Sequence, residues 1–424
     1  MGRISRELLD EIVKKKQCDD CSPIKIVAQI QPATTPNQFA SSLDQFEKAG
    51  AELVQASQSL RQVVMVIDDN HLSDLAEHPL VKNVNEVRRF TLSPLDQVSL
   101  PFLAGEASDL RPLTMTEAGR LLGGGALKDQ GYTGAGWRIA VVDSGICVRS
   151  PLLTDAVEEA RIFTGGSEHP AFFHGTAVAS ILAGQMWSDL EGVAPGVKLL
   201  DVRVFDEDST TYEAVMAGLD YAIEKRVNAV NMSFGTAEPY EPLRGAVRAM
   251  RVKGIIPIGA SGNNGLIAGT ESPSDFREAL CVGSVDSATK ERSYFSAQGP
   301  SEDGSAKPDL AAYGGSGGEA LVCGGLGESI IQVQGTSFAA PQVTGLLALL
   351  WEKFRRSPEG LLVASTGVTR KNNQTGWGIP EVSALTGTES PPYGGGGVNP
   401  LWAVGAVAGV GGLLYLASRG RRRV

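Results

Sequence analysis

The chain has 424 residues, of which 42% are hydrophobic, and a formal net charge of −10 at pH 7. This length accommodates two or three domains, and the composition is that of a folded globular protein. The acidic balance argues against a nucleic-acid-binding protein, because phosphate contacts require a basic stripe that the sequence does not offer.

Residues 1–23 form a charged N-terminal arm with a helical pattern. The arm has no apolar core of about 7–15 residues, so we expect no secretory signal peptide. Cys18 and Cys21 have the spacing of half a zinc site, but no second pair and no nearby histidine completes it. The five cysteines are odd in number and sparse, which predicts exposed thiols in the arm and no disulfide framework.

Residues 24–93 have the pattern of a separate small α+β domain. Thr35 and Pro36 begin a helix there, and Gly50 ends it. The expected elements are strands at 24–30, 51–57, 61–67 and 80–87 and helices at 35–50 and 69–78. This order is that of a split ferredoxin-like fold. His71 and His78 fall at helix ends, and residues 94–124 follow as a connection that contains proline and glycine.

Two acid–base candidates come next in the chain. The segment WRIAVVDSGI (137–146) is a short apolar strand that ends in Asp143, although an aspartate in that place commonly only caps a turn. His174, one of four histidines, begins the run HGTAVAS, which has small residues and helical spacing. Each of these signals is weak alone.

A candidate nucleophile stands at the start of an apolar helix in QGTSFAAPQVTGLLALL (334–350). A serine in that place is usually an N-cap. Pro341, which we place in the first helical turn, and small neighbours such as Gly335 and Ala339 leave Ser337 uncrowded instead. An accessible serine among the N–H groups of a helix start suits a nucleophile whose attack creates an oxyanion.

In these features the chain resembles the subtilases, the subtilisin-like serine proteases. Asp143, His174 and Ser337 follow the chain order of the subtilisin triad. The segments that carry the resemblance are VVDSGI, NMSFG (231–235), HGTAVAS, ASGNNG (260–265), GTSFAAP and GWGIPEVSAL (376–385). The resemblance covers about residues 125–386 and implies a three-layer α/β peptidase domain with a mostly parallel sheet.

The resemblance also implies how the site cleaves a protein or peptide substrate. Ser337 is the nucleophile and His174 its base. Asp143 orients the imidazole, and the amide of Asn263 donates to the oxyanion. Two walls receive the substrate backbone and its first side chain, and they consist of Ser233, Phe234, Gly235, Ala260, Ser261 and Gly262.

Glu271 is the expected specificity residue. Registering residues 269–286 on Pro273 places Glu271 at the floor of the first specificity pocket, where the family usually has a small residue. A carboxylate there favours cleavage after lysine or arginine. A register error of one or two residues would instead leave Glu271 on a solvated loop.

No cofactor is expected. The family's calcium loop corresponds to residues 184–195, which carry Asp189 and Glu191 but lack an asparagine-rich ligand pattern. Two carboxylates are fewer than the six to eight oxygens that calcium takes. Calcium thus remains possible, but the loop sequence does not support it.

The 24–93 domain, particularly SDLAEHPLVKNVNE (73–86), resembles the inhibitory propeptide of subtilases. This resemblance implies a zymogen whose own propeptide acts as an inhibitor. By the same resemblance, the end of the propeptide lies near Ser93.

A membrane anchor is expected at the other end. Residues 387–400 are a Pro/Gly linker, 401–418 are an uncharged run of 18 residues, and 419–424 are a basic tail. That run reaches the threshold for a transmembrane helix, and Trp402 and Tyr415 lie near its two ends. The alternatives are a glycine-rich helix docked on the peptidase domain and a sorting signal removed on export.

Two topology rules disagree for this anchor. The four tail arginines favour a cytoplasmic tail, which would place the peptidase domain outside. The missing signal peptide favours a peptidase domain on the cytoplasmic side, and we adopt this second orientation. As a rival to the enzyme, the same residues could form a catalytically silent scaffold that acts as a membrane-tethered binding module. The presence of all four chemical residues favours the enzyme.

Overall fold

The computed structural model describes residues 4–17, 22–92, 112–165, 170, 172–265, 269–317 and 319–387. Cys18, Cys21, the propeptide end expected near Ser93 and the linker, apolar run and tail after residue 387 lie outside these residues. Among the described residues, no helix combines the length and the apolar character needed to cross a membrane.

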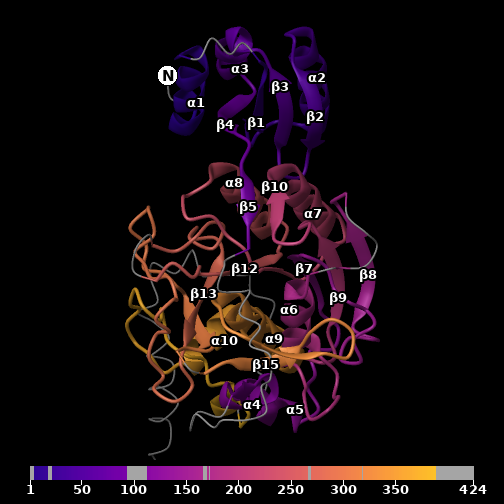
Figure 1. Ribbon diagram of the computed structural model, residues 1–424, viewed down its shortest axis with the longest axis vertical. Coiled ribbons are helices and arrows are strands. Elements are labelled where there is room, and N and C mark those ends of the chain that lie inside the picture. The colour runs from indigo at the N-terminus through magenta and orange to yellow at the C-terminus, as the bar shows by residue number, and fades with distance from the viewer. Residues whose placement is uncertain are drawn as a thin grey trace, which may run out of the picture.

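The smaller unit, at the top of Figure 1, is built on an antiparallel sheet in the order β2-β3-β1-β4. Its elements are α1 (Arg6–Gln17), β1 (Ile24–Ile30), α2 (Pro36–Lys48), β2 (Glu52–Ser57), β3 (Gln62–Ile67), η1 (Asp69–His71), α3 (Leu72–Glu77) and β4 (Val81–Glu86). Helix α2 begins as its sequence predicts, with the Thr35 hydroxyl accepting the N–H of Gln38. Helix α1 packs into the same core through the fully buried Leu8, so the arm and this unit are not separate bodies.

The larger unit has the expected three-layer α/β architecture. Its seven parallel strands follow the order β14-β13-β12-β11-β7-β9-β8. They are β7 (Arg138–Asp143), β8 (Val157–Ile162), β9 (Lys198–Arg203), β11 (Ala229–Met232), β12 (Ile256–Ala260), β13 (Leu280–Val285) and β14 (Leu310–Tyr313). Helices α6 (His174–Ala183) and α9 (Thr336–Phe354) cover one face, and α7 (Tyr212–Glu224) and α8 (Glu241–Val252) cover the other.

Shorter elements complete the larger unit. They are β6 (Leu113–Thr114), α4 (Met115–Leu121), α5 (Gly124–Lys128), β10 (Ser209–Thr211), β15 (Leu321–Gly324), β16 (Ile330–Val333), α10 (Glu359–Ser365) and η3 (Val382–Leu385), and β5 (Arg89–Thr91) of the smaller unit joins them. Met115 and Leu122 are fully buried in the core of this unit. The core therefore starts before residue 125, because a capping box formed by Thr114 and Glu117 begins a helix inside the expected connection.

The central sheet is buried on both faces, and the polar side chain of Asp143 lies at the end of one of its strands. Along β7, Ile139 and Val141 pack toward α6 and α9, whereas Ala140 and Val142 pack toward α7 and α8. Parallel strands end at the same edge of a sheet, and Asp143 is the last residue of β7. The carboxylate therefore lies at the edge where α6 begins.

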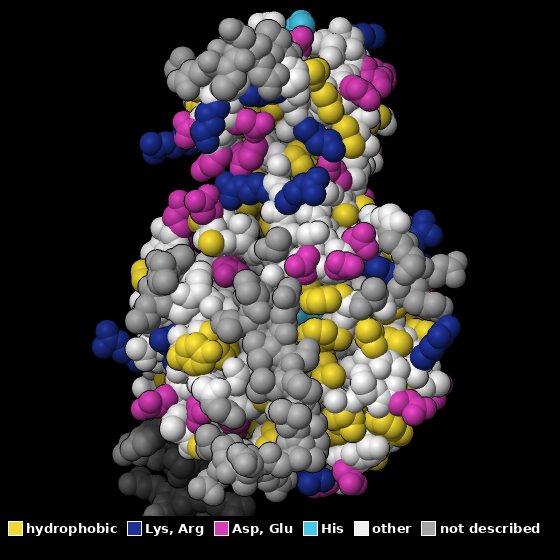
Figure 2. Space-filling view, viewed as in Figure 1, with side chains coloured by type: hydrophobic (Ala, Val, Ile, Leu, Met, Phe, Trp, Pro, Cys, Tyr) yellow, Lys and Arg dark blue, Asp and Glu magenta, His cyan; other side chains and the backbone are white. Residues whose placement is uncertain are grey.

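The two units meet on α7 and α8. Val27, Leu60 and Val64 of the smaller unit belong to one hydrophobic cluster with residues of both helices. Strand β5 leaves the smaller unit and pairs antiparallel with β10. Side chains of both charges gather along the boundary (Figure 2), including the ion pair between Lys25 and Glu213.

Candidate functional site

Asp143 and His174 form a buried hydrogen-bonded pair. The imidazole Nδ1 donates to the carboxylate, at 2.8 Å from Oδ1 and 3.0 Å from Oδ2, and both side chains are shielded from solvent. Because Nδ1 carries the hydrogen, Nε2 of the neutral ring is the basic nitrogen. The N–H of Ser144 also donates to Oδ1, at 2.6 Å, which fixes the carboxylate.

Ser337 lies at the second residue of α9 and does not cap the helix. Gly335 is the N-cap, with φ of 152° and no side-chain cap bond. The Ser337 hydroxyl instead donates to the carbonyl of Ser233, at 3.1 Å. The imidazole of His174 packs on Phe338, with ring centroids 5.3 Å apart, so the start of α9 lies beside the Asp143–His174 pair.

The prediction that Pro341 lies in the first turn of the helix is wrong, because Pro341 lies further inside α9. Without an N–H it leaves the carbonyl of Ser337, four residues earlier, without its helical donor. The hydroxyl of Ser233 donates to that carbonyl, at 2.8 Å, and itself accepts from Nδ2 of Asn231, at 3.0 Å. The helix thus tolerates a proline because Ser233, the residue directly after strand β11, supplies the missing donor.

Asn263 is oriented by the same helix start. Its Oδ1 accepts from the backbone N–H and from the hydroxyl of Thr336, each at 2.9 Å. A backbone N–H is always a donor, so the amide oxygen must face Thr336 and Nδ2 must point the other way. Sequence reasoning missed Thr336, although its place between the two motif residues Gly335 and Ser337 could have indicated it.

The six expected wall residues lie on two segments, 233–235 and 260–262. A third segment around Glu271 and Ser272 is hydrogen-bonded to both of them. The N–H of Glu271 donates to the carbonyl of Ser261, at 2.9 Å, and Thr236 and Ser272 exchange backbone hydrogen bonds of 2.9 and 3.0 Å. All of the wall residues are buried except Gly235, which is partly exposed. Ser233 contacts Ser337 twice, since its side chain donates to the Ser337 carbonyl and its own carbonyl accepts the Ser337 hydroxyl.

The side chain of Glu271 lies between the two wall glycines. A Cβ added to Gly262, whose φ is +101°, would be 2.4 Å from the Glu271 Cδ. A Cβ added to Gly235 would be 2.7 Å from Oε2. At Gly262 the positive φ adds to this contact in favouring glycine, and at Gly235 an added Cβ would also lie 2.8 Å from the Glu271 Cβ and 3.1 Å from the Ser272 carbonyl oxygen.

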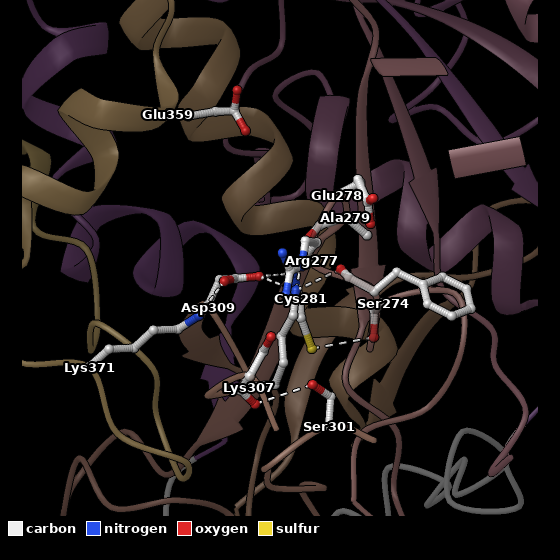
Figure 3. A network of polar contacts seen from close by, with 12 residues as sticks. Ser274, Arg277, Glu278, Ala279, Cys281, Ser301, Lys307, Asp309, Glu359 and Lys371 are labelled. Atoms are coloured by element: carbon white, nitrogen blue, oxygen red, sulfur yellow. Dashed lines mark hydrogen bonds and ion pairs between the residues drawn. The ribbon is translucent and has the colours of Figure 1, made fainter. Parts of the chain in front are cut away.

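The segment that carries Glu271 is anchored by a buried lysine (Figure 3). Lys307 is 1% exposed, and its Nζ donates to the carbonyls of Phe276 and Ala279 and to Asp309, at 2.8–2.9 Å. Asp309 also accepts from Lys371 and from the N–H of Cys281. Residues 271–279 are thus held at the far end by charge-assisted hydrogen bonds.

The smaller unit sends an aromatic side chain toward the site. Phe90 of β5 is 1% exposed and lies 6.4 Å from Phe234 and 5.9 Å from Tyr240, measured between ring centroids. Leu92 is 2% exposed, and its N–H donates to the carbonyl of Asp208, at 2.8 Å. Strand β5 thus runs along the larger unit next to the wall formed by residues 233–235.

The loop 184–195 contains Glu191, which pairs with Lys128. In the part of the chain that the structure describes, no three His, Cys, Asp or Glu side chains are grouped as metal ligands. Asp189 adopts a positive φ of 62°, which makes it a turn residue of this loop.

Comparisons with known proteins agree with this geometry. The model of the subtilase family matches residues 134–378. Subtilisin from Bacillus pumilus is 33% identical over 236 residues, which are 54% of this chain and 81% of that protein. The membrane-bound transcription factor site-1 protease of Homo sapiens is 30% identical over 233 residues, which are 53% of this chain. The chain spans only 22% of the length of that relative.

Solved structures show the same fold. Fervidolysin from Fervidobacterium pennivorans, a keratinolytic enzyme related to subtilisin, superposes with a TM-score of 0.68 at 21% identity, over 88% of this chain and 62% of its own. The epidermin leader peptide processing serine protease from Staphylococcus aureus superposes with a TM-score of 0.65 at 18% identity, over 87% of this chain and 100% of its own.

Proposed function

The chain belongs to the subtilase family of serine proteases, and on that premise we propose that it is an endopeptidase whose nucleophile is Ser337. The observation that carries the proposal is the pre-set orientation of the chemical groups. Asp143 fixes which nitrogen of His174 is basic, and Thr336 fixes which end of the Asn263 amide donates.

The proposed reaction proceeds by acyl transfer. The Ser337 Oγ attacks the scissile carbonyl carbon while its proton passes to Nε2 of His174, and Asp143 stabilises the resulting imidazolium. The oxyanion accepts hydrogen bonds from Nδ2 of Asn263 and from the Ser337 N–H. His174 returns the proton to the leaving amine, and water then hydrolyses the acyl-enzyme by the same steps. No cofactor is part of this proposal.

The rival function is a silent scaffold that binds peptides without cleaving them. Two features oppose it: the buried Asp143–His174 pair and an asparagine amide fixed by two hydrogen bonds at the start of α9. An internally quenched peptide separates the two functions, because the scaffold would bind it without releasing fluorescence.

We further propose that the site cleaves after lysine or arginine. The support is the carboxylate of Glu271, which is partly buried between the two wall glycines, since a cation that arrives with the substrate stabilises an acid in such a place further. Replacing Glu271 by Gln should lower the preference for Arg or Lys over Leu by about 10- to 100-fold, the range of a charged hydrogen bond.

A peptide library with one varied position measures this preference. Glu302→Gln, an equal charge change at an exposed residue of the same unit, is the control and should leave it unchanged. If the parent chain shows no preference for basic residues, or if Glu271→Gln retains it, Glu271 does not select the substrate.

We also propose that the smaller unit is an inhibitory propeptide. Its support is the docked surface: Gln62 donates to the carbonyl of Pro242, at 2.7 Å, and Gln29 donates to that of Glu241, at 2.9 Å. Both amides lie over Gly245 of α8, where an added Cβ would be 2.8 and 3.0 Å from them. In a unit docked in this way, Phe90 covers the place next to residues 233–235 where a substrate would make its contacts.

Gly245→Leu should loosen this docking and raise the peptidase activity of the full chain several-fold, because the new side chain displaces both glutamines without touching the site. Gly360→Leu is the matched control, since Gly360 also lies in a helix, α10, but with open space around it. The smaller unit, added as a separate chain of residues 1–93, should also inhibit the isolated peptidase domain of residues 112–386. The inhibition constant should be about 10 μM or tighter, which corresponds to a binding free energy of about 7 kcal/mol. Equal activity of Gly245→Leu and the parent chain would contradict the inhibitory role.

The membrane anchor is proposed from sequence alone. Residues 401–418 are uncharged and followed by four arginines, and we place the peptidase domain on the cytoplasmic face. The full chain should remain in membranes after a carbonate wash, whereas a chain that ends at residue 387 should not. Digestion of the peptidase domain by a protease added only outside intact cells would contradict the orientation.

A further inference from the structure

Asp201 is a buried acid directly behind the catalytic edge of the sheet. It lies in β9, which pairs with β7 so that Asp201 is opposite Val141 and Arg203 is opposite Asp143. Side chains alternate along a strand, so Asp201 shares a face with Leu199, whose side chain packs in the α6–α9 layer. Asp201 is 7% exposed, and the triad makes no use of it.

The two carboxylate oxygens of Asp201 have different surroundings. Oδ2 accepts the backbone N–H of Ile146, at 3.0 Å, whereas Oδ1 is buried and has no hydrogen-bond partner among the described residues. An ionised carboxylate normally accepts several hydrogen bonds, so this environment favours the neutral acid. Burial raises the pKa of Asp201 to about 7; the N–H of Ile146 and the guanidinium of Arg203 oppose this rise, and the Asp143 carboxylate adds to it.

The N–H that Asp201 accepts belongs to the loop directly after Asp143. Other residues of this loop are tied to α6: the Ser144 Oγ accepts the N–H of Gly175, at 3.0 Å, and the Cys147 N–H donates to Thr176, at 2.9 Å. The same loop also holds Asp143, through the Ser144 N–H. Asp201 therefore connects β9 to the segment that fixes the catalytic carboxylate.

We propose that Asp201 is a positioning residue for the peptidase reaction, which holds the loop after Asp143 and sets the charge next to the Asp143–His174 pair. This inference rests on the proposed function. In the part of the chain that the structure describes, the charged or titratable groups that face Asp201 are Asp143 on β7 and Arg203 on β9, with His174 on α6 behind Asp143.

The expected effect follows from the sign of the charge. Ionised Asp201 adds a second negative charge near the imidazolium and stabilises it, so it raises the pKa of His174. Neutral Asp201 does not. Because the two groups interact, His174 and Asp201 titrate as a coupled pair, and the imidazole signal should change in two steps as the pH rises.

The proton NMR signal of the His174 Nδ1–H, recorded between pH 5 and 9 on the full chain, tests this directly and needs no activity. In Asp201→Asn, whose amide oxygen still accepts from Ile146, the titration should become a single step shifted about 0.5–1 pH unit lower. The acid limb of kcat/KM should move by the same amount, because the reaction needs neutral His174.

The control is Asp206→Asn, which removes an exposed acid 3.6 Å from Arg203 and should leave both profiles unchanged. A single-step titration of His174 in the parent chain would overturn the proposal, and so would identical His174 pKa values in the parent and Asp201→Asn. If instead the NMR titration behaves as expected and no peptide is hydrolysed, the proposed function fails, but the coupling between His174 and Asp201 stands.

Discussion

Ser337→Ala should abolish peptide hydrolysis, with a loss of about 10⁶-fold in kcat, a magnitude borrowed from measurements on subtilisin, a relative of this chain. The physical reason is that Ser337 stands between Thr336, which holds the Asn263 amide, and Phe338, on which the His174 imidazole packs, whereas the neighbouring Thr336 hydroxyl is engaged by the Asn263 Oδ1. The loss should appear in kcat and leave KM almost unchanged, because binding to the two walls does not involve the Ser337 Oγ.

His174→Ala should cost about as much, and the double variant should cost no more than either single one, because the residues act as one unit. Ser357→Ala, an exposed serine elsewhere in the same unit, serves as the control and should retain full activity. Additive losses in the double variant would mean that Ser337 and His174 do not share a step.

Lys307→Met should have the largest effect on stability, about 3–5 kcal/mol of unfolding free energy, the usual result of removing one partner of a buried ion pair. The ammonium is the donor to two backbone carbonyls and to Asp309, and methionine leaves all three without it. Urea unfolding followed by tryptophan fluorescence measures the loss. Lys371→Met, which removes the second and more exposed cation next to Asp309, should cost about 1 kcal/mol.

The pH dependence of stability provides an independent check on Lys307. Burial by itself raises the pKa of Asp309, but Lys307, Lys371 and the Cys281 N–H outweigh it and lower the value to about 2. Because this folded-state pKa lies below the unfolded value of 3.8, the stabilisation is complete above about pH 4 and is lost as the pH falls toward 2. Lys307→Met should therefore make the stability less sensitive to acid. If Lys307→Met lowers the unfolding free energy by less than about 1 kcal/mol, the lysine does not anchor this segment.

The positions of the three triad candidates in their elements were predictable from the sequence, because each lies at the end of a strand or at the start of a helix. Asp143 ends a buried strand, and His174 and Ser337 begin helices, so a parallel sheet brings them to one edge. Asn263 and the two walls were instead indicated by the resemblance to the subtilases. It also predicted the Thr35 cap of α2, because a capping box depends on residues only three positions apart.

Features that depend on distant partners were not predictable. Pro341 lies well inside α9 because Ser233, far away in the chain, donates to the carbonyl that the proline leaves open. The boundaries of both units were misplaced where short amphipathic helices, α1 and α4, join cores formed by later segments. Asp201 has no sequence signal, since only the pairing of β9 with β7 places it behind Asp143.

Labelling by a fluorophosphonate probe followed by peptide mapping tests most directly whether Ser337 is an activated nucleophile. An activated serine attacks the phosphorus and keeps the adduct, whereas an ordinary serine hydroxyl does not react. We expect one adduct on Ser337 in Gly245→Leu, a weaker one in the parent chain and none after His174→Ala. An unlabelled Ser337 in Gly245→Leu, or an adduct that persists without His174, would contradict the assignment of this chain as a serine endopeptidase.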